Sequence, residues 1–225
     1  MPSSARCTPI KAILGGTFNP PHMGHINAAL SAASELGIET VHLMPSKVPP
    51  HKPVEVSEDH RVRMIELCCE GQSRLVPELI ELSLPSPSYT VKTLSELKEK
   101  SEHTICFFIG ADSLYNLNKW FEWDQLLNYC HLVVMRRDGE SFTPGSEIRN
   151  WLNKHVTQDM SVIHRQSHGA VILINTPLYP VSSTDIRNAL CVSKSSDSTH
   201  AISMINEWVP RRVLDYINAN QLYKS

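Results

Sequence analysis

Short, mainly apolar runs alternate with amphipathic helical patterns along most of this chain, and this alternation strongly limits the folds open to it. Each run is too short for a buried helix and lacks a polar face, which is typical of a strand covered on both sides. The expected strands occupy residues 10–14, 41–44, 104–109, 131–135 and 170–174. Separated by helices, such strands predict an α/β fold: a Rossmann-like, doubly wound, mostly parallel sheet with helices on both faces.

The segments between these runs carry helical patterns. After Gly24, apolar residues recur at helical spacing until Gly37, a residue that suits the left-handed position after a helix. Ser57 and the two acidic residues behind it predict the start of a second helix, which ends at Gly71. Further helices are expected near residues 89–99, 112–127 and 146–155, and in a last one with Pro210 in its first turn. In such a sheet ligands bind beyond the carboxyl ends of the strands, where the chain order reverses, so residues with a chemical role should cluster there.

The chain has 225 residues, 41% hydrophobic and 20% charged, which is typical of a globular protein that needs no disulfide or metal to fold. No internal repeat or long linker divides it. We therefore expect a single domain over residues 1–225, with a helical C-terminal part from about residue 183 to 225. The polar, serine-rich stretch 191–199 is expected to be a surface loop and not a domain boundary.

Charge and apolar patterning exclude several classes of protein. A net charge of −2 argues against broad electrostatic binding to nucleic acid or to a membrane surface. The first residues lack the long apolar region of a signal peptide, and no run approaches the roughly 18 apolar residues of a membrane span, so we expect a cytoplasmic protein. The six cysteines form no CxxC pair and are expected to be reduced core residues: Cys7, Cys68, Cys69, Cys106, Cys130 and Cys191.

The sequence GGTFNPPHMGH at residues 15–25 follows the first expected strand. Gly15 and Gly16 have no Cβ, so the backbone there can approach a ligand closely. His22 and His25, three residues apart at the start of a helix, can face one side, where unpaired N–H groups and the helix dipole favour an anion. These features predict a phosphate-binding turn. A single histidine here could instead be solvated or capping, and a pair could bind a metal, although no third ligand of suitable spacing is nearby.

A second candidate segment, VSSTDIRNAL at residues 181–190, follows the last expected strand. The hydroxyls of Ser182, Ser183 and Thr184 could simply cap the next helix. Arg187 lies one turn into that helix, where its planar guanidinium can bind two phosphate oxygens at once. Arg187 therefore makes this segment a second candidate for contact with phosphate.

Both segments resemble signature motifs of the nucleotidyltransferase superfamily that carries the HxGH motif. The matching residues are the glycine pair, Phe18, Pro20, His22 and His25 in the first segment, and Val181 to Arg187, similar to ISxTxIR, in the second. The resemblance implies transfer of a nucleotide from a nucleoside triphosphate with loss of pyrophosphate. It also implies that the two histidines contact the triphosphate and stabilise the transition state, and that the arginine binds the β- and γ-phosphates.

Further segments are similar to bacterial nicotinate mononucleotide adenylyltransferases, so that the resemblance covers nearly the whole chain. They are MPSKVPPHKP (44–53), SPSYTVKTL (86–94), FFIGADSLYNLNKW (107–120), HLVVMRR (131–137) and the C-terminal VPRRVLDYINANQLY. The resemblance assigns to ATP the residues Gly15, Gly16, Thr17, Phe18, His22, His25, Gly110, Asp112, Ser183, Thr184 and Arg187. It assigns to the mononucleotide the residues Asn19, Lys47, His51, Lys52, Thr90, Trp120 and Arg137.

Within this assignment each group has an implied role. His51 and Lys52 would hold the phosphate of the mononucleotide, Thr90 would lie beside the pyridine ring, and Trp120 would stack on that ring. Gly110 and Asp112 would meet a ribose. Without the resemblance, the proline-rich stretch at 44–53 is an ordinary surface loop, and a tryptophan is more often a core residue than a ligand platform.

Two departures from the pattern concern single positions. Many bacterial members carry Asp where this chain has Asn19, and Asp138 stands where the related motif has proline. The first departure weakens the assignment to a subfamily and leaves the expected chemistry unchanged. The second bears on the role of Arg137.

The resemblance implies that the chain joins the adenylyl group of ATP to nicotinate mononucleotide, giving deamido-NAD and pyrophosphate in NAD biosynthesis. We expect direct in-line attack, in which the residues His22, His25 and Arg187 neutralise charge growing on the α-phosphate and the leaving group. Mg²⁺ would arrive with ATP, without a protein metal site. Three alternatives stay open: nicotinamide mononucleotide as preferred substrate, a sister transferase that uses pantetheine phosphate or a polyol phosphate with CTP, and a nucleotide-binding regulator without turnover. The oligomeric state is not predicted.

Overall fold

A seven-stranded parallel sheet organises the computed structural model, which describes residues 8–47, 55–192 and 199–223. The strands are β1 (Ile10–Gly16), β2 (Val41–Pro45), β3 (Leu75–Pro77), β4 (Thr104–Gly110), β5 (His131–Arg137), β6 (Val156–Thr157) and β7 (Val171–Thr176). They lie in the order β3-β2-β1-β4-β5-β7-β6, and every pairing is parallel. The predicted doubly wound α/β sheet is therefore confirmed.

The chain order reverses beside β1. From β1 the chain moves outward to β2 and β3, then returns to β4 on the other side of β1 and continues toward β5 and β7. Ala12 accordingly pairs with Val41 on one side and with Cys106 on the other. The carboxyl ends of β1 and β4 thus form the switch point at which open α/β sheets bind ligands.

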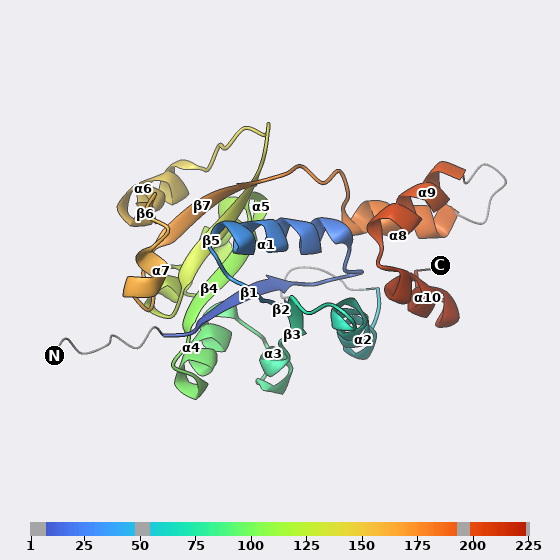
Figure 1. The fold of residues 1–225 in the computed structure, drawn as a ribbon, viewed down its shortest axis with the longest axis horizontal. Helices are drawn as coiled ribbons and strands as arrows, with labels where there is room; N and C mark the ends of the chain where they lie inside the picture. Colours follow the sequence, from blue (N-terminus) through green and yellow to red (C-terminus); the bar gives the residue numbers. More distant parts are fainter. Residues whose placement is uncertain (1–7, 48–54, 193–198, 224–225) are drawn as a thin grey trace.

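Helices cover both faces of the sheet (Figure 1). They are α1 (Met23–Glu35), α2 (Glu58–Cys69), α3 (Ile80–Ser83), α4 (Thr90–Lys100), α5 (Ala111–Tyr115), α6 (Ser146–His155), α7 (Val162–Arg165), α8 (Ser183–Val192), α9 (Thr199–Trp208) and α10 (Arg211–Ala219), with 3₁₀ turns η1 (Leu117–Lys119) and η2 (Trp123–Asn128). Figure 1 shows α8, α9 and α10 grouped beyond the carboxyl end of β1. In the described ranges, no helix combines the length and the apolarity that crossing a bilayer requires.

Two apolar cores lie on opposite faces of the sheet, because successive residues of a strand point to opposite sides. In β4, Cys106 and Phe108 belong to the core under α1, α2 and the C-terminal helices. Ile105, Phe107 and Ile109 belong to the core under α4, α5 and α6. A strand buried on both faces has no polar side, which explains why these runs are apolar throughout.

The structure differs from the sequence prediction mainly in short elements. β3 and β6 were not predicted, because strands of three and two residues are too short to show a periodicity. The single helical stretch expected over 112–127 is wrong: Glu122 adopts a left-handed backbone (φ 47°), and the segment divides into α5, η1 and η2. Pro210 lies at the N-cap of α10 and not in its first turn.

The expected loop at 191–199 is wrong at both of its described ends. α8 continues through Val192 and α9 begins at Thr199, while residues 193–198 lie outside the described ranges. The cysteines behave largely as expected, since Cys68, Cys69, Cys106 and Cys130 are buried. Cys191 is exposed, and Cys7 lies outside the described ranges.

Candidate active site

Aromatic packing explains the two glycines at the end of β1. A Cβ on Gly15 would lie 2.8 Å from Cζ of Phe107 in the neighbouring strand, and a Cβ on Gly16 would lie 3.1 Å from Cζ of Phe18. Phe18 is buried, with a left-handed backbone at φ 50°. From the sequence alone, close approach of a ligand is the expected reason for both glycines. The structure shows that rings of the protein itself already fill the space where each Cβ would lie.

Gly15→Ala is expected to lower the free energy of unfolding by about 1–3 kcal/mol, the usual effect of overpacking a core. The added methyl would meet the Phe107 ring, which lies in the middle of the sheet and has little room to move. Urea unfolding of the variant measures the loss. In a Phe107→Leu background the same substitution should destabilise less. Equal losses in both backgrounds would show that Phe107 is not the obstacle.

His22 and His25 form a stacked pair at the start of α1. His22 is the N-cap of this helix, and its Nδ1 accepts a hydrogen bond from the backbone N–H of His25 at 3.4 Å. The two ring centroids lie 3.6 Å apart, and the Phe18 ring packs edge-on against His25 at 5.4 Å. Because Nδ1 of His22 accepts, the neutral form of this ring carries its proton on Nε2. That nitrogen is the donor that the ring can offer to a ligand.

Gly24, between the two histidines, lets the helix start against the second motif. A Cβ there would lie 2.8 Å from Cγ1 of Val181 and 2.9 Å from Nδ1 of His22. Any larger residue would push these two segments apart. The glycine of the HxGH pattern is thus a packing requirement.

Both histidines are neutral in the free protein. Burial lowers the pKa of His22 to about 2, and the positive charge of Arg137, together with that of His25 whenever His25 is protonated, acts in the same direction. Burial also lowers the pKa of His25 to about 4, again with a contribution from Arg137. From the sequence, the two rings are expected to neutralise phosphate charge. Their lowered pKa values instead make both rings neutral, and Arg137 is the positive charge that acts on both.

The pH dependence of stability should report this neutral pair. Since both pKa values lie below the unfolded value near 6.5, the unfolded chain binds protons first as the pH falls. The contribution of the pair is complete above pH 6.5 and decreases below it, by up to about 1.4 kcal/mol per pH unit for each ring. Urea unfolding at pH 7, 6 and 5 should therefore show a smaller loss of stability for a His22→Gln, His25→Gln double variant than for the wild type. Parallel curves would contradict the lowered pKa values.

The second motif meets the first at Arg187. This residue projects from α8, and its Nη1 donates to the carbonyl oxygen of Asn19 at 2.8 Å. Ser183 donates through Oγ to the carbonyl oxygen of Pro20 at 2.9 Å. Segments more than 160 positions apart in the sequence are thereby held together. Ser182 takes the capping role considered for the hydroxyls, because its Oγ accepts from the N–H of Asp185 at 3.2 Å.

Asn19 lies at the centre of this contact and is buried. Its Nδ2 donates to Glu55 Oε2 at 2.7 Å, and its Oδ1 accepts from the hydroxyl of Tyr223 at 2.6 Å. Glu55 in turn pairs with Nε of Arg187 at 3.0 Å. An amide can donate to one partner while it accepts from the other, whereas an ionised carboxylate can only accept. This gives a physical reason for Asn in place of the more common Asp. The same two hydrogen bonds occupy a side chain that the resemblance assigns to the mononucleotide.

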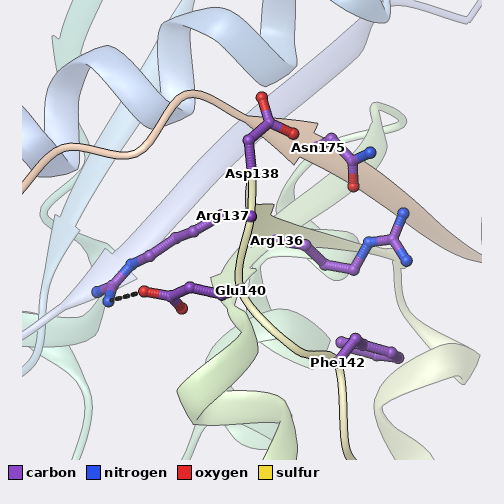
Figure 2. A pocket seen from close by; sticks show the side chains of 7 residues that line it. Arg136, Arg137, Asp138, Glu140, Phe142 and Asn175 are labelled. Carbon is purple, nitrogen blue, oxygen red and sulfur yellow. Dashed lines mark hydrogen bonds and ion pairs between the residues drawn. The ribbon is translucent and has the colours of Figure 1, made fainter.

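The carboxyl ends of β4 and β5 supply the next group of predicted residues. Arg137 lies 3.7 Å from the carboxylate of Asp112 and 3.2 Å from that of Glu140. Figure 2 shows that Arg136 and Arg137 point to opposite sides of the strand end, Arg136 toward the Phe142 ring. Gly110 is the N-cap of α5, with open space around the position of a Cβ. A pocket at this strand end is lined by Arg136, Arg137, Asp138, Gly139, Glu140, Phe142 and Asn175.

An aromatic stack joins the segments of Thr90 and Trp120. Tyr89, the N-cap of α4, stacks on Phe121 with ring centroids 4.4 Å apart. The ammonium of Lys92 lies over both rings, 5.2 Å and 5.4 Å from their centroids. Thr90 opens α4, and Trp120 is half-buried at the end of η1. The structure thus brings together the two segments that the sequence argument assigned to the pyridine ring.

The remaining predicted residues divide into two groups. Lys47 is described, and its ammonium donates to the carbonyl oxygen of Leu84 at 2.7 Å. His51 and Lys52 lie outside the described ranges. The structure therefore leaves their predicted role as a prediction.

Two buried charges near Lys47 were missed by the sequence argument. Arg61 is 2% exposed and Glu81 is 5% exposed. Arg61 shares a helix face with the apolar residues Met64 and Ile65, and a charge on an apolar face is a pattern that could have revealed it. The four-residue helix that carries Glu81 is too short for such a pattern.

A metal site made by the protein was not expected. Across residues 8–47, 55–192 and 199–223, no group of three or more His, Cys, Asp or Glu side chains lies close enough to hold an ion.

Comparisons with known proteins found relatives in sequence and in fold. The model of a family described as "Cytidylyltransferase-like" matches residues 13–189. A protein of Idiomarina loihiensis named "Probable nicotinate-nucleotide adenylyltransferase" is 38% identical over 217 residues, which cover 95% of this chain and 99% of that protein. A protein of Yersinia enterocolitica with the same name is 35% identical over 228 residues and covers 100% of both chains.

A solved structure shares the fold. It is Plasmodium falciparum nicotinic acid mononucleotide adenylyltransferase complexed with NaAD, with a TM-score of 0.68 at 20% identity, covering 96% of this chain and 97% of that chain. At this identity the likeness extends to the fold alone. It agrees with the parallel sheet described above.

Proposed function

The chain belongs to the cytidylyltransferase-like family, and from that premise we propose that it is a nicotinate-nucleotide adenylyltransferase, like the relatives that match its full length. It transfers the adenylyl group of ATP to nicotinate mononucleotide and releases deamido-NAD and pyrophosphate, a step of NAD biosynthesis. One observation carries the proposal for the site. The stacked histidines after β1 and Arg187 of α8 come from two motifs that are held together by hydrogen bonds at Asn19 and Pro20.

The reaction needs positioning and charge stabilisation more than a protein nucleophile. An oxygen of the mononucleotide 5′-phosphate attacks the α-phosphorus of ATP, and the bond from that phosphorus to the bridging oxygen of the β-phosphate breaks. A phosphate monoester is already nucleophilic near pH 7. The protein has to align the two phosphates and stabilise the charge that shifts to pyrophosphate.

The residues divide between the two substrates. His22 and His25 offer neutral N–H donors to the triphosphate, Arg187 offers a planar cation, and Arg137 adds positive charge at the end of β5. Ser183 and Thr184, at the start of α8, lie beside Arg187. Thr90 and Trp120 contact the pyridine ring of the mononucleotide. The phosphate of the mononucleotide is held by Lys47, His51 and Lys52. Gly110 and Asp112 meet a ribose.

Mg²⁺ is proposed to enter with ATP. The described residues bring no cluster of carboxylates together, which fits an ion held mainly by phosphate oxygens and water. Bound in this way, the ion supplies further neutralisation of the leaving pyrophosphate.

A chromatographic assay tests the function directly. ATP is offered with nicotinate mononucleotide and with nicotinamide mononucleotide. In two sister-transferase arms, ATP is offered with pantetheine phosphate and CTP with a polyol phosphate. Deamido-NAD should form with the highest kcat/KM. A higher kcat/KM for NAD formation would make the amide the preferred substrate, and product only in a sister-transferase arm would identify a sister transferase. Binding of ATP without any product would indicate a regulator.

A further inference from the structure

A two-residue segment after β2 has its entire backbone held by buried charges and by β1. The N–H of Ser46 donates to the carbonyl oxygen of Gly16 at 2.9 Å, and the N–H of Lys47 donates to Glu81 Oε1 at 3.1 Å. The carbonyl oxygens of Ser46 and Lys47 both accept from Arg61, at 2.6 Å and 2.8 Å. In an irregular segment after a strand, such backbone N–H and carbonyl groups would otherwise bind water. Here all four have a protein partner, so the path of the backbone at Ser46 and Lys47 is fixed.

Arg61 links this segment to the turn after β1. Its Nη1 also donates to the carbonyl oxygen of Thr17 at 3.1 Å, so one planar guanidinium bridges carbonyls from two loops. The Nε of Arg61 is buried and has no hydrogen-bond partner in the described part of the chain. A buried cation with an unpaired N–H is a poor way to gain stability, since an apolar residue of similar size often does as well. The geometry favours a role in placing the loops.

Glu81 links the same segment to α4. Besides the N–H of Lys47, its carboxylate accepts from the hydroxyl of Ser88 and from Oγ1 of Thr93 at 3.4 Å. Ser88 lies two residues before Thr90, and Thr93 is fully buried in α4. Burial raises the pKa of Glu81, while its hydrogen bonds and the charge of Arg61 act in the opposite direction.

We propose that Arg61 and Glu81 are positioning residues, which hold Ser46 and Lys47 between the Thr17 turn and the Ser88–Thr90 segment and so assemble the mononucleotide side of the site. This role rests on the proposed function. Glu81 touches only the mononucleotide side. Arg61 touches both sides, because Thr17 lies in the turn assigned to ATP.

Steady-state kinetics of Glu81→Ala tests the proposal. The variant should raise KM for nicotinate mononucleotide by about tenfold or more, the effect of losing about one well-placed hydrogen bond, and change KM for ATP by less than about threefold. Glu81→Gln keeps an oxygen that can accept from Lys47 and should restore most of the loss. Arg61→Lys keeps the charge but not the fork, and it should raise both KM values.

Glu78→Ala is the matched control. Glu78 is also a part-buried carboxylate, three residues earlier, but it binds Lys11 and the N–H of Ile80 and does not contact Ser46 or Lys47. Its kinetics should stay near those of the wild type. Parallel changes of both KM values in Glu81→Ala, no change at all, or a Gln variant as damaged as the Ala variant would each overturn the positioning role. If Glu81→Ala does not fold, the KM values of the other two variants decide. The positioning role then requires that Glu81→Gln stays near the wild type and that Arg61→Lys raises both KM values.

The two levels of the proposal fail in different ways. A wild-type protein that forms no deamido-NAD from ATP and nicotinate mononucleotide overturns the proposed function, and the role of Arg61 and Glu81 with it. If the wild type is active but the Glu81 variants raise KM for ATP and for nicotinate mononucleotide equally, only the positioning role is overturned.

Discussion

His25→Ala should lower kcat by about two to three orders of magnitude, the usual effect of removing one preorganised donor from a transition state, and change KM for ATP only by about fivefold or less. The ring stacks on His22 and meets the Phe18 ring edge-on, so its place after β1 is fixed before any ligand binds. In the proposed reaction, a neutral ring would attract the ground-state triphosphate only weakly. Its N–H would stabilise the transition state most, because negative charge then moves onto the leaving pyrophosphate.

The assay compares three histidine variants under saturating mononucleotide. His25→Asn keeps an amide donor on a shorter side chain and should retain part of the activity. His164→Ala removes an exposed histidine from α7, outside the motif, and should behave as the wild type. Thermal unfolding confirms that each variant is folded. Near-normal turnover of His25→Ala would remove this histidine from the mechanism.

The sequence predicted the centre of the fold well, because the central strands are buried on both faces. β1, β2, β4, β5 and β7 were each found from a mainly apolar run, interrupted only by Lys11 in β1 and by His42 in β2. β3 and β6 lie at the two edges of the sheet and are too short to show such a run. The break at Glu122 was not visible either, since a left-handed residue in a helical pattern depends on tertiary packing.

The resemblance indicated which motifs belong together, but not their charge. The structure brings the segments of His22 and Arg187 into contact, while their roles toward phosphate stay a prediction. The resemblance could not indicate that the rings are neutral, because their pKa values depend on burial and on Arg137. The spacing of residues in the sequence also cannot show that a buried carboxylate 34 positions away, Glu81, accepts a hydrogen bond from the backbone N–H of Lys47.

Arg187→Ala should lower kcat/KM for ATP by about two to four orders of magnitude, within the range seen when a cation is removed from a phosphoryl-transfer site. Arg187→Lys should recover little of this, because an ammonium cannot replace a fork that contacts Asn19, Thr184 and Glu55 at once. The loss of stability should be small. The partner carboxylate of Glu55 has 54% of its side chain exposed, so it can be hydrated when Arg187 is gone, and such pairs contribute about 1 kcal/mol or less.

The combination of the two measurements is what identifies Arg187 as a binding residue. If Arg187 were only structural, its replacement would lower the melting temperature and the amount of active enzyme together. If it binds the triphosphate, its replacement lowers kcat/KM while the protein stays folded. Arg211→Ala is the matched control, since Arg211 is an exposed arginine of the C-terminal helices that pairs with Asp215 on its own helix. Its activity should equal that of the wild type. If Arg187→Ala kept kcat/KM for ATP within about fivefold, less than the 1.4 kcal/mol that corresponds to a factor of ten, the two motifs would touch without sharing a ligand.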